Sequence, residues 1–141
     1  MGETLSDAEM DALVEKIQLA AGLRRYVKVL GIWSTYVGMV FDEKRTKDKQ
    51  SVELRTSLRE QREACVADAL DEEKRVYAAA GVMAIDMVSR AVAQAFDFST
   101  YSGAKRCAFI QKAIQEEIDG VQETLLPLQE ILNDLLPEGE E

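Results

Sequence analysis

Proline occurs only twice in this sequence, at Pro127 and Pro137, so no residue before position 127 by itself forbids an α-helix. Strong helix formers, among them Ala, Leu, Glu, Lys and Arg, dominate the composition. Val and Ile never form alternating runs of strand length bounded by turns. We therefore expect an all-α fold.

The first helix has a clear start signal, because Ser6 and Glu9 have the spacing of a capping box. Gly22 is a good helix stop, so this first helix is predicted to end there. The apolar residues between these two points recur on one helical face, which indicates a core-facing side: Met10, Leu13, Val14, Ile17 and Ala21.

A second helix is predicted over residues 23–44, and residues 29–41 are apolar on almost every side. A helix of this kind is either buried in a protein or lies in a membrane. At 1.5 Å per residue the apolar part is about 20 Å long, whereas a hydrocarbon core is ~30 Å thick. We therefore predict a central helix of a bundle, with Trp33 in the core, and no transmembrane segment.

Residues 46–50 are predicted to form a loop, with Ser51 as the N-cap of a third helical segment that reaches residue 96. One straight helix over this range would be about 69 Å long, which exceeds any small bundle. We expect a bend near Gly81 or a protruding end. The window 78–96 is the most apolar of the chain, so Ile85 is predicted to be a core residue.

The last helix follows a loop over residues 97–103, with Ser99 or Ser102 as its cap. Its apolar residues continue in alternating steps of three and four, the spacing of a heptad seam. Pro127 interrupts this seam and predicts a kink, or a new short helix starting there.

These elements together predict one domain over residues 1–141, a compact bundle of four to five helices. In this bundle the third helix is long and bent and the C-terminal helix is kinked at Pro127. Residues 1–5 and 137–141 are expected to be frayed tails. A chain of this length can bury a core without disulfides or metals.

The chain contains no histidine, which removes the commonest general base near neutral pH and the commonest transition-metal ligand. Cys65 and Cys107 lie in helical patterns without metal-ligand spacing, and are interpreted as small buried residues. The acidic runs 71–73 and 116–117 are interpreted as solvated surface. No phosphate-binding or nucleophile motif occurs. We therefore predict no catalytic residues, no metal, no cofactor and no enzymatic activity.

The C-terminal helix has more large apolar residues than one side of a bundle can cover, which favours a protein partner and, in particular, a second copy of the chain. The candidate interaction residues are Leu125, Leu128, Ile131, Leu132, Leu135 and Leu136.

The net charge is −9, yet residues 23–50 hold seven basic and three acidic residues. The two basic groups lie at opposite ends of the second helix, and are either solvated helix ends or docking points for an anion or an acidic partner. These candidates are Arg24, Arg25, Lys28, Lys44, Arg45, Lys47 and Lys49. Nucleic-acid binding is disfavoured, because the whole chain would repel phosphates and no basic stripe with aromatics occurs.

The leading hypothesis is a non-enzymatic helical interaction or assembly protein that self-associates through its C-terminal helix. The alternative is a small acidic inhibitor, such as an immunity protein, antitoxin or nucleic-acid mimic, that neutralises a basic protein target. Because the acidic N-terminal stretch has no apolar segment of the signal-peptide kind, we expect a cytoplasmic protein.

Overall fold

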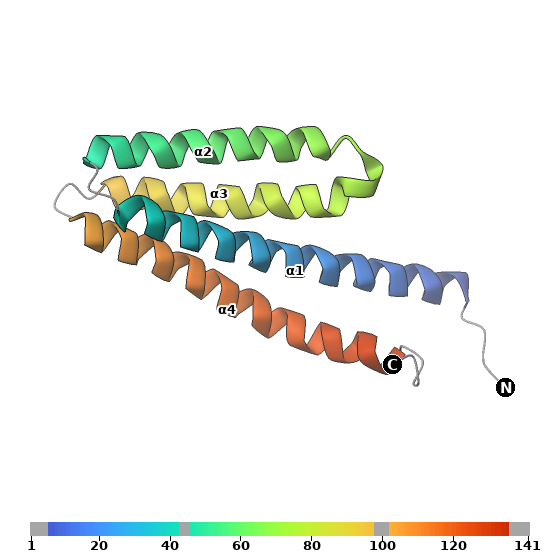
Figure 1. Ribbon diagram of the computed structural model, residues 1–141. Coiled ribbons are helices and arrows are strands. Elements are labelled where there is room, and N and C mark those ends of the chain that lie inside the picture. Colours follow the sequence, from blue (N-terminus) through green and yellow to red (C-terminus); the bar gives the residue numbers. More distant parts are fainter. Residues whose placement is uncertain (1–5, 43–45, 98–101, 136–141) are drawn as a thin grey trace.

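The computed structural model describes residues 6–42, 46–97 and 102–135 and has four α-helices in these ranges (Figure 1). They are α1 (Asp7–Asp42), α2 (Lys47–Asp68), α3 (Arg75–Asp97) and α4 (Gly103–Leu135), with a 3-10 turn at Glu72–Lys74 before α3. No strand occurs in the described ranges. The prediction of an all-α bundle of four to five helices is confirmed.

Helix α3 is the centre of the bundle and packs against α1, α2 and α4. By contrast, α1 and α2 scarcely touch each other. Helices α2 and α3 form an antiparallel hairpin, and α1 and α4 form a longer antiparallel pair beside it (Figure 1). At 36 residues α1 is about 54 Å long, whereas α3, at 23 residues, is about 35 Å. The N-terminal part of α1 therefore extends past the α2–α3 turn, and we call this the open end (Figure 1).

The predicted break at Gly22 is wrong, because α1 is one helix from Asp7 to Asp42. A glycine in a helix interior costs about 1 kcal/mol relative to alanine, which tertiary contacts can offset. The buried side of α1 runs on without interruption through this position, with Ala20 and Tyr26 on either side. A Cβ at Gly22 would lie 3.6 Å from Val76 Cγ1, so α1 passes close to the start of α3 here.

The predicted long third helix is also wrong, because residues 51–96 form parts of two helices joined by a turn. The amides of Leu70 and Asp71 donate to the carbonyls of Ala67 and Asp68, which ends α2. The side chain of Asp71 then accepts from the amide of Glu73 and caps the next turn. The acidic run at 71–73 therefore contains a turn signal that was interpreted only as solvated surface.

Gly81, the predicted bend, lies inside α3 at a close approach to α2. A Cβ at this position would lie 2.8 Å from Cys65 Sγ. The glycine therefore sets the distance between the two helices of the hairpin.

The helix caps agree with the sequence in two of three cases. The Ser6 hydroxyl accepts from the Glu9 amide and the Glu9 carboxylate accepts from the Ser6 amide, as a capping box requires. Ser102 caps α4, whereas Ser99 lies outside the described residues. At α2 the cap is Thr46, which accepts from the Lys49 amide, so the predicted Ser51 cap is wrong.

Helix α4 passes through Pro127 without ending, so no new helix begins there. The expected kink at Pro127 stays a prediction.

Residues 72–97 are long and apolar enough, by length and composition, to cross a membrane, which was not expected of this segment. Within the fold this segment has α1, α2 and α4 packed around it, as the core helix of a bundle does.

The core lies where α1, α3 and α4 meet, with Leu54 and Leu58 added from α2. Trp33 is 7% exposed and Ile85 is 2% exposed, so both predicted core positions are confirmed. On α3, the buried side is rich in small residues, which allows the neighbouring helices to approach closely: Ala80, Gly81, Ala84, Ala91 and Ala95.

The core predicts that Ile85→Ala lowers the free energy of unfolding by about 2–5 kcal/mol, from lost transfer energy and a residual cavity. Met83→Ala, on the same helix but 62% exposed, should change it by no more than about 0.5 kcal/mol. Urea unfolding of both variants checks this. If both variants lost the same free energy of unfolding, the assignment of Ile85 to the buried side of α3 and Met83 to the exposed side would be wrong.

Candidate functional site

The six candidate interaction residues of α4 divide into inward and outward positions. Three of them continue the face that buries Ile110 and Ile114 and lie toward α1: Leu132 is buried, and Leu125 and Leu128 are half-buried. Ile131 is 45% exposed. Leu135 is the last residue of α4, with a side chain outside the described part of the structure, and Leu136 lies outside the described residues. The leucine seam is therefore covered in large part by the chain itself.

The open end carries an apolar stripe that the sequence placed in the core. Met10, Val14 and Ile17 lie on one side of α1, and each is nearly half exposed. For these three residues the expectation of a core-facing position is wrong, because α1 extends past the α2–α3 hairpin and nothing described covers its outer side, whereas Leu13 is half-buried. We call these three residues the open-end stripe.

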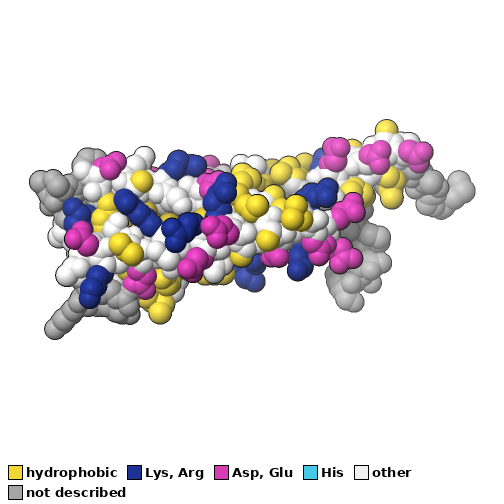
Figure 2. Space-filling model, turned by 90° about the horizontal axis from the view of Figure 1, so that it is seen from above, with side chains coloured by type: hydrophobic (Ala, Val, Ile, Leu, Met, Phe, Trp, Pro, Cys, Tyr) yellow, Lys and Arg dark blue, Asp and Glu magenta, His cyan; other side chains and the backbone are white. Residues whose placement is uncertain are grey.

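Figure 2 shows the narrow end of the molecule, where hydrophobic and acidic side chains lie together. An apolar hollow of about 520 Å³ lies where the open end joins the body of the bundle. It is lined on α1 by Leu19 and Leu23, on α3 by Val76 and Met83, and on α4 by Val121. Leu126, also on α4, is 64% exposed. Exposed apolar side chains thus occur on both α1 and α4 at this end.

The structure separates the basic candidates into two groups. Lys47 and Lys49 are exposed at the start of α2, and Lys44 and Arg45 lie outside the described residues. Arg24, Arg25 and Lys28 instead line a cavity of about 550 Å³ between α1 and the turn end of the hairpin. We call this the basic cavity.

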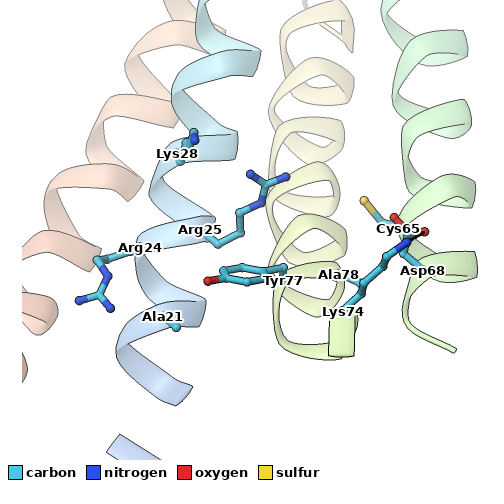
Figure 3. A pocket seen from close by; sticks show the side chains of 9 residues that line it. All are labelled: Ala21, Arg24, Arg25, Lys28, Cys65, Asp68, Lys74, Tyr77 and Ala78. Atoms are coloured by element: carbon cyan, nitrogen blue, oxygen red, sulfur yellow. Dashed lines mark ion pairs between the residues drawn. The ribbon is translucent and has the colours of Figure 1, made fainter. Parts of the chain in front are cut away.

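Two further residues of the basic cavity were missed by the sequence analysis, Lys74 and Tyr77 (Figure 3). They come from the turn before α3 and from its first turn, and the turn itself was not predicted. The charged residues of the cavity wall are four bases and one acid, Asp68.

The basic side chains of the cavity have different partners (Figure 3). Arg24 points toward α4 and donates to the Gln129 side-chain oxygen. Lys74 extends toward α2, where its Nζ lies 3.9 Å from Asp68 Oδ1. Both members of that pair are more than half exposed, so it contributes little to stability. Arg25 lies between α1 and α3, and its Nε is buried without a hydrogen-bond partner among the described residues.

The two cysteines are free and half-buried, and Cys65 is part of the basic cavity. Desolvation, and then the charge of Asp68, raise the pKa of the Cys65 thiol, although Arg25 opposes them. Burial and the charge of Asp42 raise the pKa of Cys107. Both residues are therefore thiols rather than nucleophilic thiolates at neutral pH. Across the described residues, no three Cys, Asp or Glu side chains are grouped so that they could hold a metal ion.

Glu117 is not a solvated surface residue as predicted, because it is half-buried between α4 and α1. Its Oε2 accepts a 2.5 Å hydrogen bond from the Tyr26 hydroxyl. Burial, together with this bond and the charge of Glu117, raises the pKa of Tyr26 well above its ordinary value.

In comparisons with known proteins, no protein family, curated protein or solved structure matches the chain.

Tyr26 predicts a loss of stability at high pH. The folded protein keeps the phenolic proton, whereas the unfolded chain releases it above about pH 10. The contribution of Tyr26 to the free energy of unfolding is therefore complete below that pH and falls as the pH rises. At neutral pH, Tyr26→Phe should cost about 1–2 kcal/mol through the lost hydrogen bond.

Urea unfolding between pH 8 and 11 measures this effect. Over this range the free energy of unfolding of Tyr26→Phe should decrease less than that of the parent protein. Tyr77→Phe, which changes an exposed ring, should show the same decrease as the parent. If the parent and Tyr26→Phe fall in parallel, the contact with Glu117 has been misassigned.

Proposed function

We propose that this protein is a non-enzymatic helical interaction and assembly module that self-associates through its open end. The observation that supports this most directly is the open-end stripe, together with exposed Leu126 and Ile131 on α4. Isolated apolar side chains on a surface are ordinary, but three of them in one stripe at the end of a long helix favour an interface.

The energetics are favourable for a second copy as the partner. Complete burial of a fully exposed large apolar side chain contributes about 1.5–3 kcal/mol, and the stripe residues, each a little under half exposed, can gain about half of that. A two-fold interface uses each residue twice. The three stripe residues then supply six apolar side chains to such an interface. A bundle formed by the open ends of two copies would also cover the half-exposed edges of Leu125 and Leu128.

Further parts of the proposal rest on the sequence. The absence of histidine and of catalytic motifs supports a role without catalysis, metal or cofactor. A bend at Pro127 would tilt the last turns of α4, and with them Ile131, relative to α1.

The proposal predicts a dimer or larger assembly in solution, and a shift toward the 15.7 kDa monomer when Val14→Glu is introduced. Light scattering after gel filtration measures the mass. The matched control is Val52→Glu, which places the same charge on an exposed valine of α2 and should leave the mass unchanged. A parent protein that is monomeric at all concentrations tested would refute self-association.

A second candidate function, the acidic inhibitor of a basic protein, is favoured by an acidic stripe on α4. Five exposed carboxylates lie within an arc of about 60° on this helix, at 100° per residue: Glu116, Asp119, Glu123, Glu130 and Asp134. Charge-steered capture of a basic partner would slow markedly at high salt, whereas apolar pairing of two copies would change little. The salt dependence of any complex therefore separates the two functions.

A further inference from the structure

We propose that the basic cavity binds a small phosphorylated molecule, with its phosphate group bound by Arg25 and by lysines of the cavity wall. This inference is separate from self-association, because the cavity lies beside the hairpin turn and shares no residue with the open-end stripe.

The charge at this place is opposite to that of the whole protein. The chain carries −9, yet the cavity wall holds four bases and one acid. Lys28 has no ion-pair partner among the described residues, and the only acid, Asp68, forms a long and exposed contact with Lys74. Lys28 and Lys74 are exposed at the cavity, so their charges are available to an anion that enters it.

Arg25 gives a second reason for an anion. Its Nε is removed from water and makes no hydrogen bond within the described part of the chain. A buried guanidinium donor without a partner costs free energy that a phosphate oxygen would recover, because arginine matches the geometry of phosphate. In Figure 3 the Arg25 side chain lies between α1 and α3. The Tyr77 ring extends from α3 toward α1, on the side where Arg25 lies.

The volume and neighbourhood of the cavity indicate a small ligand with an uncharged part. At about 550 Å³ the cavity is in the range of small-molecule sites. A second cavity of about 380 Å³ shares Arg25 and Cys65 with it, and is lined by Val29, Ile32 and Trp33. A ligand with its phosphate in the basic cavity can therefore place an aromatic or hydrocarbon group against Trp33. A nucleic-acid polymer is disfavoured by the negative charge of the whole chain.

Asp68 is the competitor of the ligand. In the structure it is the partner of Lys74, so its carboxylate competes with a bound phosphate for that ammonium group and repels the phosphate charge. Removal of this carboxylate should therefore strengthen binding, whereas removal of Lys74 should weaken it. These opposite directions distinguish a phosphate site from a general response of the protein to salt.

Protection of Cys65 from iodoacetamide tests the proposal at constant ionic strength, with inorganic pyrophosphate as the first probe. Cys65 lines both cavities, and Cys107, outside them, is an internal control in the same molecule. We expect saturable slowing of Cys65 modification and no change at Cys107. Equal Cys65 rates with and without millimolar pyrophosphate would overturn the proposal.

The variants are compared by the ratio of Cys65 rates with and without pyrophosphate, because substitutions near the thiol also change its baseline reactivity. Lys74→Met should weaken binding about tenfold, and Asp68→Asn should strengthen it. Lys112→Met removes an exposed lysine of α4 and should have no effect. If Lys74→Met and Lys112→Met behave alike, the phosphate does not bind in this cavity.

ADP and hexyl phosphate identify the uncharged part of the ligand. Tighter protection by ADP than by pyrophosphate, with a change in Trp33 fluorescence, would indicate an aromatic group. The same result with hexyl phosphate would indicate a hydrocarbon chain. Equal protection by all three probes would overturn the role of the Trp33 cavity.

Discussion

The burial of α3 is the constraint on which the rest of the structure depends. This helix is apolar over most of its circumference, and three helices are needed to remove it from water. Small residues along its buried side allow α1, α2 and α4 to approach closely. Because α3 is much shorter than α1 and α4, a bundle built around it leaves the ends of the longer helices without a hairpin beside them. Both the open-end stripe and the apolar hollow result from this difference in length.

Local signals in the sequence were enough to predict the helical class, two of the caps and the buried positions of Trp33 and Ile85. The breaks were not predictable in the same way. Gly22 is a good local stop, but contacts with α3 carry the helix through it. The break at 69–71 has no proline or glycine, and it forms because the two segments bury apolar residues against each other when the chain folds back. The periodicity of apolar residues shows which face of a helix is buried, but it does not show where the chain turns back to form an antiparallel pair.

The candidate surfaces were predictable only in part, because they depend on where the chain turns back between α2 and α3. Arg24, Arg25 and Lys28 stand out as a basic group, yet the cavity becomes visible only when the hairpin turn brings Lys74 and Tyr77 to them. In α4 the leucine spacing indicated apolar contact correctly, but the contact of Leu132 is made inside the chain. The open-end stripe has the spacing of a core face, and its exposure depends on how far α1 extends past α3.

The close approach of Gly81 to Cys65 makes these two positions share one volume. A methyl group at position 81 would occupy the space of the sulfur, which lies 2.8 Å from the place of its Cβ. Alanine at position 81 therefore requires the thiol to rotate away, or a smaller residue at position 65. The free-energy effects of substitutions at the two positions should then be strongly non-additive, since a loss at one site makes room for a gain at the other. The spacing of the hairpin thus makes the residue that position 65 accepts depend on the residue at position 81.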